Sequence, residues 1–462
     1  MGENVESTGN KNVDMILGDY KNAMRKMAIP MIISMLVTTS YTLVDAIWTS
    51  VLGANPLAAV GFVNPIFMIV MGIGNGLAAG ATSLIARKIG GKNKKGADEA
   101  ATQSIIVSII IAIILTLVIL IFQKPILIGL GASGVINLAM GYSTYLFAGT
   151  IFIILSSVFA GVLRAEGDVN RSLYAMIITA VLNIVLDPIF MLYLNMGVIG
   201  NAIATVISAF IATFVIFYWL FIKSDTYVKI KRDYIKPNFK VMKDMLWVGI
   251  PSSLEMVCTS ILLIITNTVL ILVANTNAVA VYTAGIRVVL FGIVPSIGLS
   301  VATITVAGAA FGAGDYEKLR NVLMYSLKIG LILSLIVGVV IFIFSDYFAL
   351  LFSFSANTAP LIGDISALFK VMFLFFLATP FGLISGSFFQ SLGKGPLSLG
   401  FTFVRELIFT TIFILLFAFV FNFGQYGVWF GMCFGKLIGA LIGCAYSIKY
   451  SGDLIKKDKK VN

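Results

Sequence analysis

Twelve long apolar runs, separated by short polar segments, constrain the fold of this 462-residue chain more than any other feature. A helix needs about 20 apolar residues to cross a bilayer, and every run is at least that long. Backbone groups in lipid must hydrogen-bond within their own segment, which favours helices. We therefore predict an all-α polytopic membrane protein with twelve transmembrane helices, at residues 27–50, 57–86, 98–122, 134–163, 170–194, 198–222, 241–273, 279–311, 317–345, 361–391, 397–421 and 427–450.

The composition supports this fold class and excludes several functions. The chain is 59% hydrophobic and 11% charged, with a mean hydropathy of +1.02, whereas soluble domains carry about 25% charged residues. It has no histidine, which removes histidine metal ligands and proton relays. Cys258, Cys433 and Cys444 lie in apolar runs without zinc spacing, so we interpret them as small hydrophobic residues. We expect neither an enzyme nor a resident metal or cofactor.

The net charge of +11 lies almost wholly on one side of the predicted membrane. Of the Lys and Arg residues outside the predicted spans, only Lys124 lies on the opposite side. By the positive-inside rule the basic side is cytoplasmic, with both termini there in a protein of the cell membrane. The charge is therefore a topology signal that favours contact with anionic headgroups, and no nucleic-acid partner is expected. The polar first 26 residues lack the apolar core of a cleaved signal peptide. The basic side carries the N-terminus, residues 87–95, the loop from Arg164 to Arg171, the segments 223–243 and 315–328, Lys394, Arg405 and the C-terminal tail.

The two halves of the chain resemble each other. RKMAIPMIISML at 25–36 is similar to LWVGIPSSLEMV at 246–257, and NMGVIGNAIAT at 195–205 is similar to QYGVWFGMCFGK at 425–436. Six spans per half give both halves the same orientation, so an axis along the membrane normal relates them. We predict a cytoplasmic N-terminal segment, an N-lobe, a cytoplasmic linker, a C-lobe and a basic tail, at residues 1–26, 27–222, 223–240, 241–450 and 451–462.

Polar residues inside the N-terminal half predict a cation site. Asp45 and Asp187 lie in the outer thirds of the first and fifth spans, and an intramembrane carboxylate is retained at a cost of ~2.5–3.5 kcal/mol. Asn183 shares a helix face with Asp187, and Thr205 of the sixth span lies at a similar depth. Oxygen ligands suit a hard cation, and two close carboxylates share a proton readily. The alternative is that both acids are merely satisfied by hydrogen bonds.

The C-terminal half carries a different set of charges. Glu255 lies near mid-depth of the seventh span, and the bases Arg287, Lys370 and Lys436 lie inside other spans. We expect Glu255 to pair with one of these bases, with Arg287 as the favoured partner. A contact of Glu255 and Arg287 with substrate in a cleft is the second interpretation.

These residues resemble the multidrug and toxic compound extrusion (MATE) family, most closely its DinF-related prokaryotic and archaeal branch, over about residues 20–450. The resemblance rests on Pro30 and Asp45 in the first span, IARKIGGKNKKGADEA after the second, FAGVLRAEGD after the fourth, NIVLDP in the fifth and GVIGNAIAT before the sixth. It implies that Asp45, Asn183, Asp187 and Thr205 form the coupling site. The NorM-like branch also uses acids of the C-terminal lobe, but Glu255 and the acid-free core of the tenth span depart from that pattern.

The resemblance implies a secondary antiporter that exports organic, often cationic or amphipathic, drug-like compounds by alternating access. Na⁺ or H⁺ would drive it, with no other cofactor. The alternative is a flippase for lipid-linked saccharides from the same wider superfamily, which the intramembrane bases favour. No second chain is needed to enclose a cleft, so we expect a monomer in the lipid bilayer.

Overall fold

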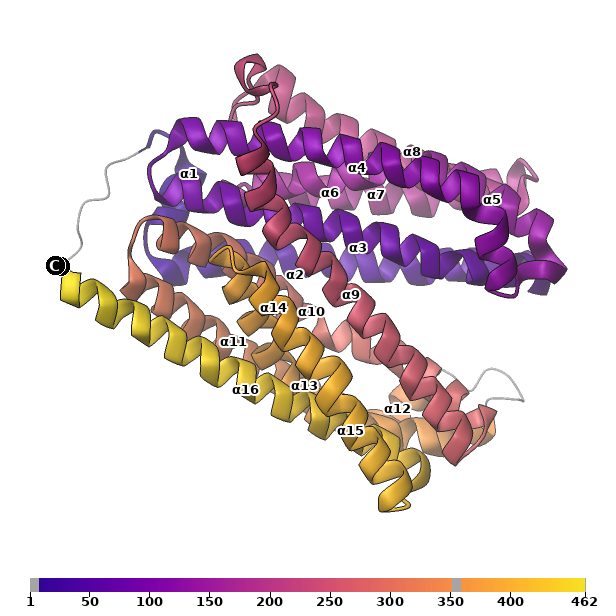
Figure 1. The fold of residues 1–462 in the computed structure, drawn as a ribbon. Helices are drawn as coiled ribbons and strands as arrows, with labels where there is room; N and C mark the ends of the chain where they lie inside the picture. Colours follow the sequence, from indigo (N-terminus) through magenta and orange to yellow (C-terminus); the bar gives the residue numbers. More distant parts are fainter. Residues whose placement is uncertain (1–7, 351–358, 462) are drawn as a thin grey trace. The chain divides into compact units, whose positions relative to one another are not determined.

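The chain consists largely of long helices in the computed structural model, which describes residues 8–350 and 359–461 (Figure 1). Within these ranges no β-strand occurs. Eleven helices are long and apolar enough to cross a membrane, and α5 and α6, bent by 43° at their junction, supply a twelfth span. The predicted all-α fold with twelve spans is confirmed.

The first six spans come from the N-terminal half. A short helix, α1 (Lys11–Leu17), precedes them. The spans are α2 (Tyr20–Val51), α3 (Ala54–Gly90), α4 (Lys94–Gly129), α5 (Ile136–Ala148) with α6 (Thr150–Ala165), α7 (Val169–Pro188) with the π-helical turn η2 (Ile189–Tyr193), and α8 (Gly197–Phe217) with the π-helical turn η3 (Tyr218–Lys223).

The second six spans follow the same order. They are α9 (Phe239–Val273), α10 (Thr276–Gly312), α11 (Tyr316–Ile343), α13 (Ile362–Ser391), the series α14 (Gly395–Phe403), η6 (Val404–Phe409), α15 (Thr410–Leu415) and η7 (Leu416–Val420), and α16 (Gly424–Val461). Short elements η1 (Ala132–Val135), η4 (Arg232–Tyr234), α12 (Ser345–Leu350) and η5 (Ala359–Leu361) lie between spans.

Several helices extend beyond the apolar runs that predict them. The last span was expected to end at residue 450, but α16 continues to Val461. The extension carries lysines on an otherwise helical segment, and Lys459 pairs with Glu317 of α11 at 3.4 Å. Hydropathy marks only the part of a helix that lies in lipid, so the polar continuation of the helix was not visible in the pattern.

The chain forms two compact units, and two helices, α2 and α9, are each divided between them. Of the described residues, unit 1 contains 8–18 and Ile33–Ser253, and unit 2 contains Asp19–Ile32 and those from Leu254 onward. The first half of α2 therefore belongs to unit 2, and the first half of α9 belongs to unit 1. In unit 1, α3, α4, α6 and α8 lie side by side, and in unit 2, α13 packs against α10, α11 and α16 (Figure 1).

Glycines let both divided helices pack closely against their neighbours. In unit 1, a Cβ atom at Gly76 of α3 would lie 2.7 Å from the backbone N of Ser253 in α9. In unit 2, a Cβ atom at Gly298 of α10 would lie 3.0 Å from the backbone N of Ile32 in α2. Gly298 follows Gly76 by 222 positions and Ser253 follows Ile32 by 221, which is the repeat spacing seen in the sequence. Gly76 belongs to the glycine-rich run 71–81 of α3, which packs closely against α9.

The segment between the two halves is fixed to unit 1 by two buried carboxylates. Glu166, after α6, accepts a hydrogen bond from the backbone N–H of Val228 at 2.8 Å. Asp98 of α4 accepts one from the N–H of Lys229 at 2.8 Å and pairs with Lys231 at 3.3 Å. Burial raises the pKa of the Glu166 carboxyl to about 8, and the Val228 hydrogen bond opposes the shift. The linker is therefore held in place rather than free.

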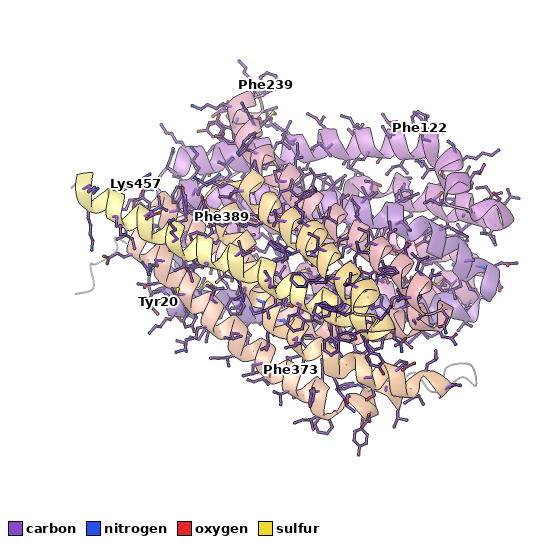
Figure 2. The ribbon with its side chains drawn as sticks, turned by 60° about the horizontal axis from the view of Figure 1, so that its bottom comes forward. Tyr20, Phe122, Phe239, Phe373, Phe389 and Lys457 are labelled. Atoms are coloured by element: carbon purple, nitrogen blue, oxygen red, sulfur yellow. The ribbon has the colours of Figure 1, made fainter. Side chains whose placement is uncertain are left out.

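Outer helix faces are apolar, as a lipid environment requires. Ile114, Leu117, Ile121 and Phe122 of α4 are all about half-exposed or more. Phe122 points away from the bundle in Figure 2. Exposed apolar surface of this extent would be unstable in water, so it marks the surface that contacts the bilayer.

Candidate functional site

Three helices of unit 1 position the predicted site residues. Asp45 lies in α2 and is half-buried, whereas Asn183 and Asp187 of α7 are 2% and 0% exposed. Pro188 ends α7, and the π-helical turn η2 follows it, because proline removes one hydrogen-bond donor from the backbone. Thr205 lies in α8, which packs along α7.

Hydrogen bonds bring these helices together at one level. Asn183 donates from Nδ2 to the hydroxyl of Thr205 at 3.2 Å. Asn201 of α8 donates from Nδ2 to Oδ1 of Asp45. The carboxyl groups of Asp45 and Asp187 lie within hydrogen-bonding reach of each other. The structure thus places all four predicted residues in one cluster.

Asn201 is a site residue that the sequence reasoning missed. It lies in the quoted motif GVIGNAIAT, four residues before Thr205 and therefore on the same face of α8. Asn183 and Asp187 have the same four-residue spacing on α7, so helix periodicity alone indicates Asn201 as a neighbour of the cluster.

Oxygen atoms dominate the cluster, and these hydrogen-bond acceptors outnumber the hydrogen-bond donors around them. Four buried oxygens have no hydrogen-bond donor among the described residues: Oδ1 of Asn183, Oδ1 of Asn201 and both oxygens of Asp187. Buried acceptors are normally satisfied, and an unsatisfied one costs about 1–3 kcal/mol. Two carboxyl groups that face each other need a proton or a cation between them.

Aromatic side chains surround the acids. Tyr41, one turn before Asp45 on α2, and Tyr142 of α5 are close enough to interact electrostatically with Asp45 and Asp187. The indole Nε1–H of Trp48, one turn after Asp45, has no acceptor among the described residues. Such a site can hold a hard monovalent cation or a shared proton among oxygens. A metal site of the usual kind has three or more Asp, Glu, His or Cys ligands, and this cluster has only two acids. No group of three or more such residues lies together in the described part of the chain.

Glu255 of α9 lies among neutral donors. Its Oε1 atom accepts a hydrogen bond from the hydroxyl of Ser398 at 2.7 Å, and Gln390 donates from Nε2 to both carboxylate oxygens at 3.2 and 3.3 Å. The predicted pairing of Glu255 with Arg287 is therefore wrong. Arg287 is exposed on α10 and makes no ion pair within the described ranges. Helix packing brings α13 and α14 to Glu255, which spacing alone could not predict.

Glu406 is a buried acid that the sequence reasoning missed. It is 3% exposed in the π-helical segment η6 and pairs with Nε of Arg405 at 3.1 Å and Nζ of Lys436 at 2.9 Å. Lys436 also lies over the ring of Phe375, 5.0 Å from its centroid. Arg405, which the sequence counts with the basic side, has a side chain that is 13% exposed, and it lies ten residues after the start of the helical span Gly395–Val420.

The intramembrane bases are largely neutralised. Lys436 is paired with Glu406, and Lys370 is paired with the exposed carboxylate of Asp346 at 3.6 Å. These two lysines and Arg287 were the sequence basis for a site that binds phosphate-bearing lipids. Their pairing removes most of that basis.

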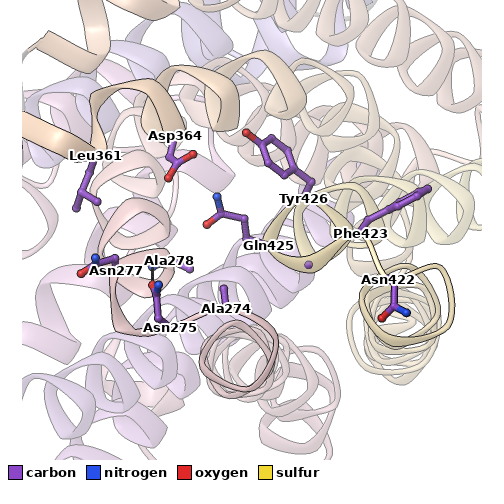
Figure 3. Close-up of a pocket in the computed structure, with 11 residues that line it drawn as sticks. Ala274, Asn275, Asn277, Ala278, Leu361, Asp364, Asn422, Phe423, Gln425 and Tyr426 are labelled. Atoms are coloured by element: carbon purple, nitrogen blue, oxygen red, sulfur yellow. Dashed lines mark hydrogen bonds between the residues drawn. The ribbon is translucent and has the colours of Figure 1, made fainter.

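A separate cavity of about 450 Å³ lies at one end of unit 2 (Figure 3). Asp364 of α13 and Gln425 and Tyr426 of α16 line it, together with residues between α9 and α10. It contains none of the predicted site residues and a single acid. The cluster of predicted site residues in unit 1 is therefore the candidate functional site.

Comparisons with known proteins agree on the family. The sequence profile of the MatE family matches residues 30–189 and 251–423. A curated relative, the "Probable multidrug resistance protein NorM" of Thermotoga maritima, is 27% identical over 369 residues, which cover 78% of each chain.

Solved structures match over nearly the whole chain. A crystal structure of MATE in complex with MaL6 has a TM-score of 0.95 and 39% identity, and the match covers 97% of this chain and 100% of the other. An outward-facing multidrug resistance MATE family transporter of the MOP superfamily has a TM-score of 0.94 and 39% identity, with 97% and 99% covered.

Proposed function

This chain belongs to the MatE family, and we propose that it is a secondary active multidrug efflux transporter. The family is one of multi-pass membrane transporters rather than of enzymes. In this proposal the protein exports organic, often cationic or amphipathic, compounds from the cytoplasm. Inward movement of Na⁺ or H⁺ supplies the energy, and the protein acts as a monomer in the cell membrane with both termini in the cytoplasm.

The unsatisfied oxygens around Asp45 and Asp187 carry the proposal. A buried cluster of carboxylate and amide oxygens without matching donors favours a bound cation or a shared proton over a self-sufficient hydrogen-bond network. Asp45 and Asp187 hold the driving ion, and the carbonyl oxygens of Asn183 and Asn201 complete its surroundings. The hydroxyl of Thr205 is held in the same cluster by Asn183.

Ion binding must favour one conformation over another to drive transport. α2 offers a route, because its residues up to Ile32 belong to unit 2 and its later residues belong to unit 1. Pro30 lies just before this point and lacks the backbone N–H that would stiffen the helix. We infer that a cation at Asp45 changes the bend of α2, and that this change alternates access to the substrate site and releases substrate outward.

Glu255 is the proposed substrate contact in unit 2, because its carboxylate is held by neutral donors only and can accept a cationic group. Arg287, exposed on the same unit, is the second candidate. The flippase alternative has weaker support, since Lys370 and Lys436 are already paired with acids.

Export of a cationic dye from proteoliposomes tests the proposal. The double variant Asp45→Asn plus Asp187→Asn should abolish the dependence of export on the ion gradient. Asp364→Asn, which changes an acid of unit 2 away from the cluster, is the matched control and should export normally. Export by the double variant with full ion dependence would show that these acids do not couple transport.

A further inference from the structure

Unit 2 contains an acid and a base that lie close to each other but are not paired with one another. Glu255 and Arg405 interact electrostatically, yet no ion pair within 4.0 Å joins them in the described part of the chain. Arg405 uses only its Nε atom, toward Glu406. Its two terminal guanidinium nitrogens make no hydrogen bond among the described residues. A charged group at this depth is costly unless it meets a partner or a polar cavity.

One face of α13 sets the spacing between the two charges. Gly382, Gly386 and Gln390 recur every four residues and therefore lie on one face, each about 6 Å from the next. The guanidinium of Arg405 lies directly against Gly382, where a side chain would collide with it. A Cβ atom at Gly386 would lie 3.2 Å from the hydroxyl of Ser398.

The same face leads to Glu255. Ser398, which lies beside Gly386, donates its hydroxyl to Glu255, and Gln390 donates its amide to the same carboxylate. The guanidinium and the carboxylate are thus between one and two helical turns apart along α13, about 6–12 Å. The absence of side chains at Gly382 and Gly386 lets Arg405 and Ser398 lie directly against α13.

The charges in this region balance only as a set. Arg405 and Lys436 supply two positive charges, and Glu406 and Glu255 supply two negative charges. A ligand that carried only a cation would bring its charge close to Arg405, and one that carried only an anion would bring its charge close to Glu255. A ligand with both groups neutralises both residues and adds no net charge to a buried site.

We propose that Glu255 and Arg405 form a subsite for zwitterionic amphiphiles, in which the cationic group of the ligand binds Glu255 and its carboxylate binds the terminal nitrogens of Arg405. Arg–carboxylate pairs are often bidentate, which suits these two free nitrogens. Ser398 and Gln390 position Glu255, and Gly382 lets the guanidinium of Arg405 lie against α13. Glu255 and Arg405 are both partly exposed, so a ligand can reach them. This proposal rests on drug export as the proposed function and names a substrate class for it.

Equilibrium binding of two matched dyes to the purified full-length protein tests the subsite. Rhodamine 110 carries a cationic ring system and a free carboxylate, and rhodamine 123 is its methyl ester without the negative charge. Fluorescence anisotropy without an ion gradient should show tighter binding of rhodamine 110. Arg405→Gln should weaken binding of rhodamine 110 by about tenfold or more, which is ~1.4 kcal/mol. It should change the affinity for rhodamine 123 less than about twofold.

Companion variants keep the test decisive. Arg405→Lys keeps the positive charge beside Glu406 but lacks the two terminal nitrogens, and it should give a selective loss of rhodamine 110 binding in the same direction if Arg405→Gln does not fold. Lys370→Gln removes an exposed base of unit 2 and should leave both dyes unaffected. Equal affinities of the two dyes in the wild type, equal loss of both in the Arg405 variants, or no binding of either would overturn the subsite.

Failure of this subsite can be distinguished from failure of the proposed function. Ion-driven export without a preference between the dyes would contradict the subsite alone. Selective binding of rhodamine 110 without ion-driven export would contradict the coupling role of Asp45 and Asp187 and leave the subsite standing.

Discussion

Asn201 donates a hydrogen bond to the carboxylate of Asp45, although 156 residues separate them in the chain. This bond fixes an acid of α2 to α8. Asn201→Ala should therefore weaken binding of the driving ion roughly tenfold, since a hydrogen bond to a charged group contributes ~1.5 kcal/mol or more. The measurement is the Na⁺ concentration, or the pH, that gives half-maximal dye export. Asn277→Ala, in the cavity of unit 2, should not change it, and an unchanged value for Asn201→Ala would remove Asn201 from the site.

The crossing of α3 and α9 depends on the absence of a side chain at Gly76. Gly76→Ala would place its methyl group 2.7 Å from the backbone N of Ser253, so we expect a loss of ~1–3 kcal/mol in stability. Gly61→Ala in the same helix meets nothing within 4 Å and should be neutral or slightly stabilising. Thermal unfolding in detergent compares the two variants. Equal unfolding temperatures would contradict the close crossing.

Buried and exposed ion pairs of unit 2 should differ in their effect on stability. Glu406→Ala leaves Arg405 and Lys436 as close, uncompensated cations, and we expect a loss of ~3–5 kcal/mol. Glu317→Ala breaks the exposed pair with Lys459 and should cost less than ~1 kcal/mol. Chemical denaturation measures both. A small effect of Glu406→Ala would mean that the three charges do not depend on one another.

The stability that Glu166 contributes to the linker should depend on pH. Its pKa is about 8 in the folded protein, raised by burial from 4.5. The stability that it contributes is therefore fully present below the unfolded value and is lost as the pH rises through about 8. Hydrogen exchange at residues 226–232, corrected for intrinsic rates, should show weaker protection above about pH 8 than below it.

The neutral variant Glu166→Gln provides the control for this pH effect. It cannot ionise, so protection of the linker should stay constant across the same range. A pH-dependent loss of the same size in the variant would assign the effect to another group, of which Asp168, Arg171 and Lys94 are the nearest charged candidates.

The sequence predicted the cluster in unit 1 because its residues follow simple rules. Asp45 and Asp187 are acids in apolar runs, and Asn183 is one turn from Asp187. Helix periodicity and depth counting suffice for such residues. Asn201 was missed, although the same four-residue spacing connects it to Thr205.

The cluster in unit 2 could not be derived in the same way. Glu406 and Arg405 are adjacent in sequence, and the sequence counts Arg405 with the basic side. The π-helical segment η6, which holds both, has no proline to mark it, unlike η2 after Pro188. The partners of Glu255 come from α13 and α14, and only tertiary packing brings Ser398 and Gln390 to it.

The most direct test of the central claim measures ion flux during dye export. Proteoliposomes with wild-type protein or Asp45→Asn are loaded with a cationic dye, and uptake of ²²Na⁺ or quenching of a pH-sensitive dye is followed with and without export. We predict ion entry that accompanies export in the wild type and is lost in the variant. Unchanged ion flux in Asp45→Asn would contradict the account and make Asp45 a structural acid.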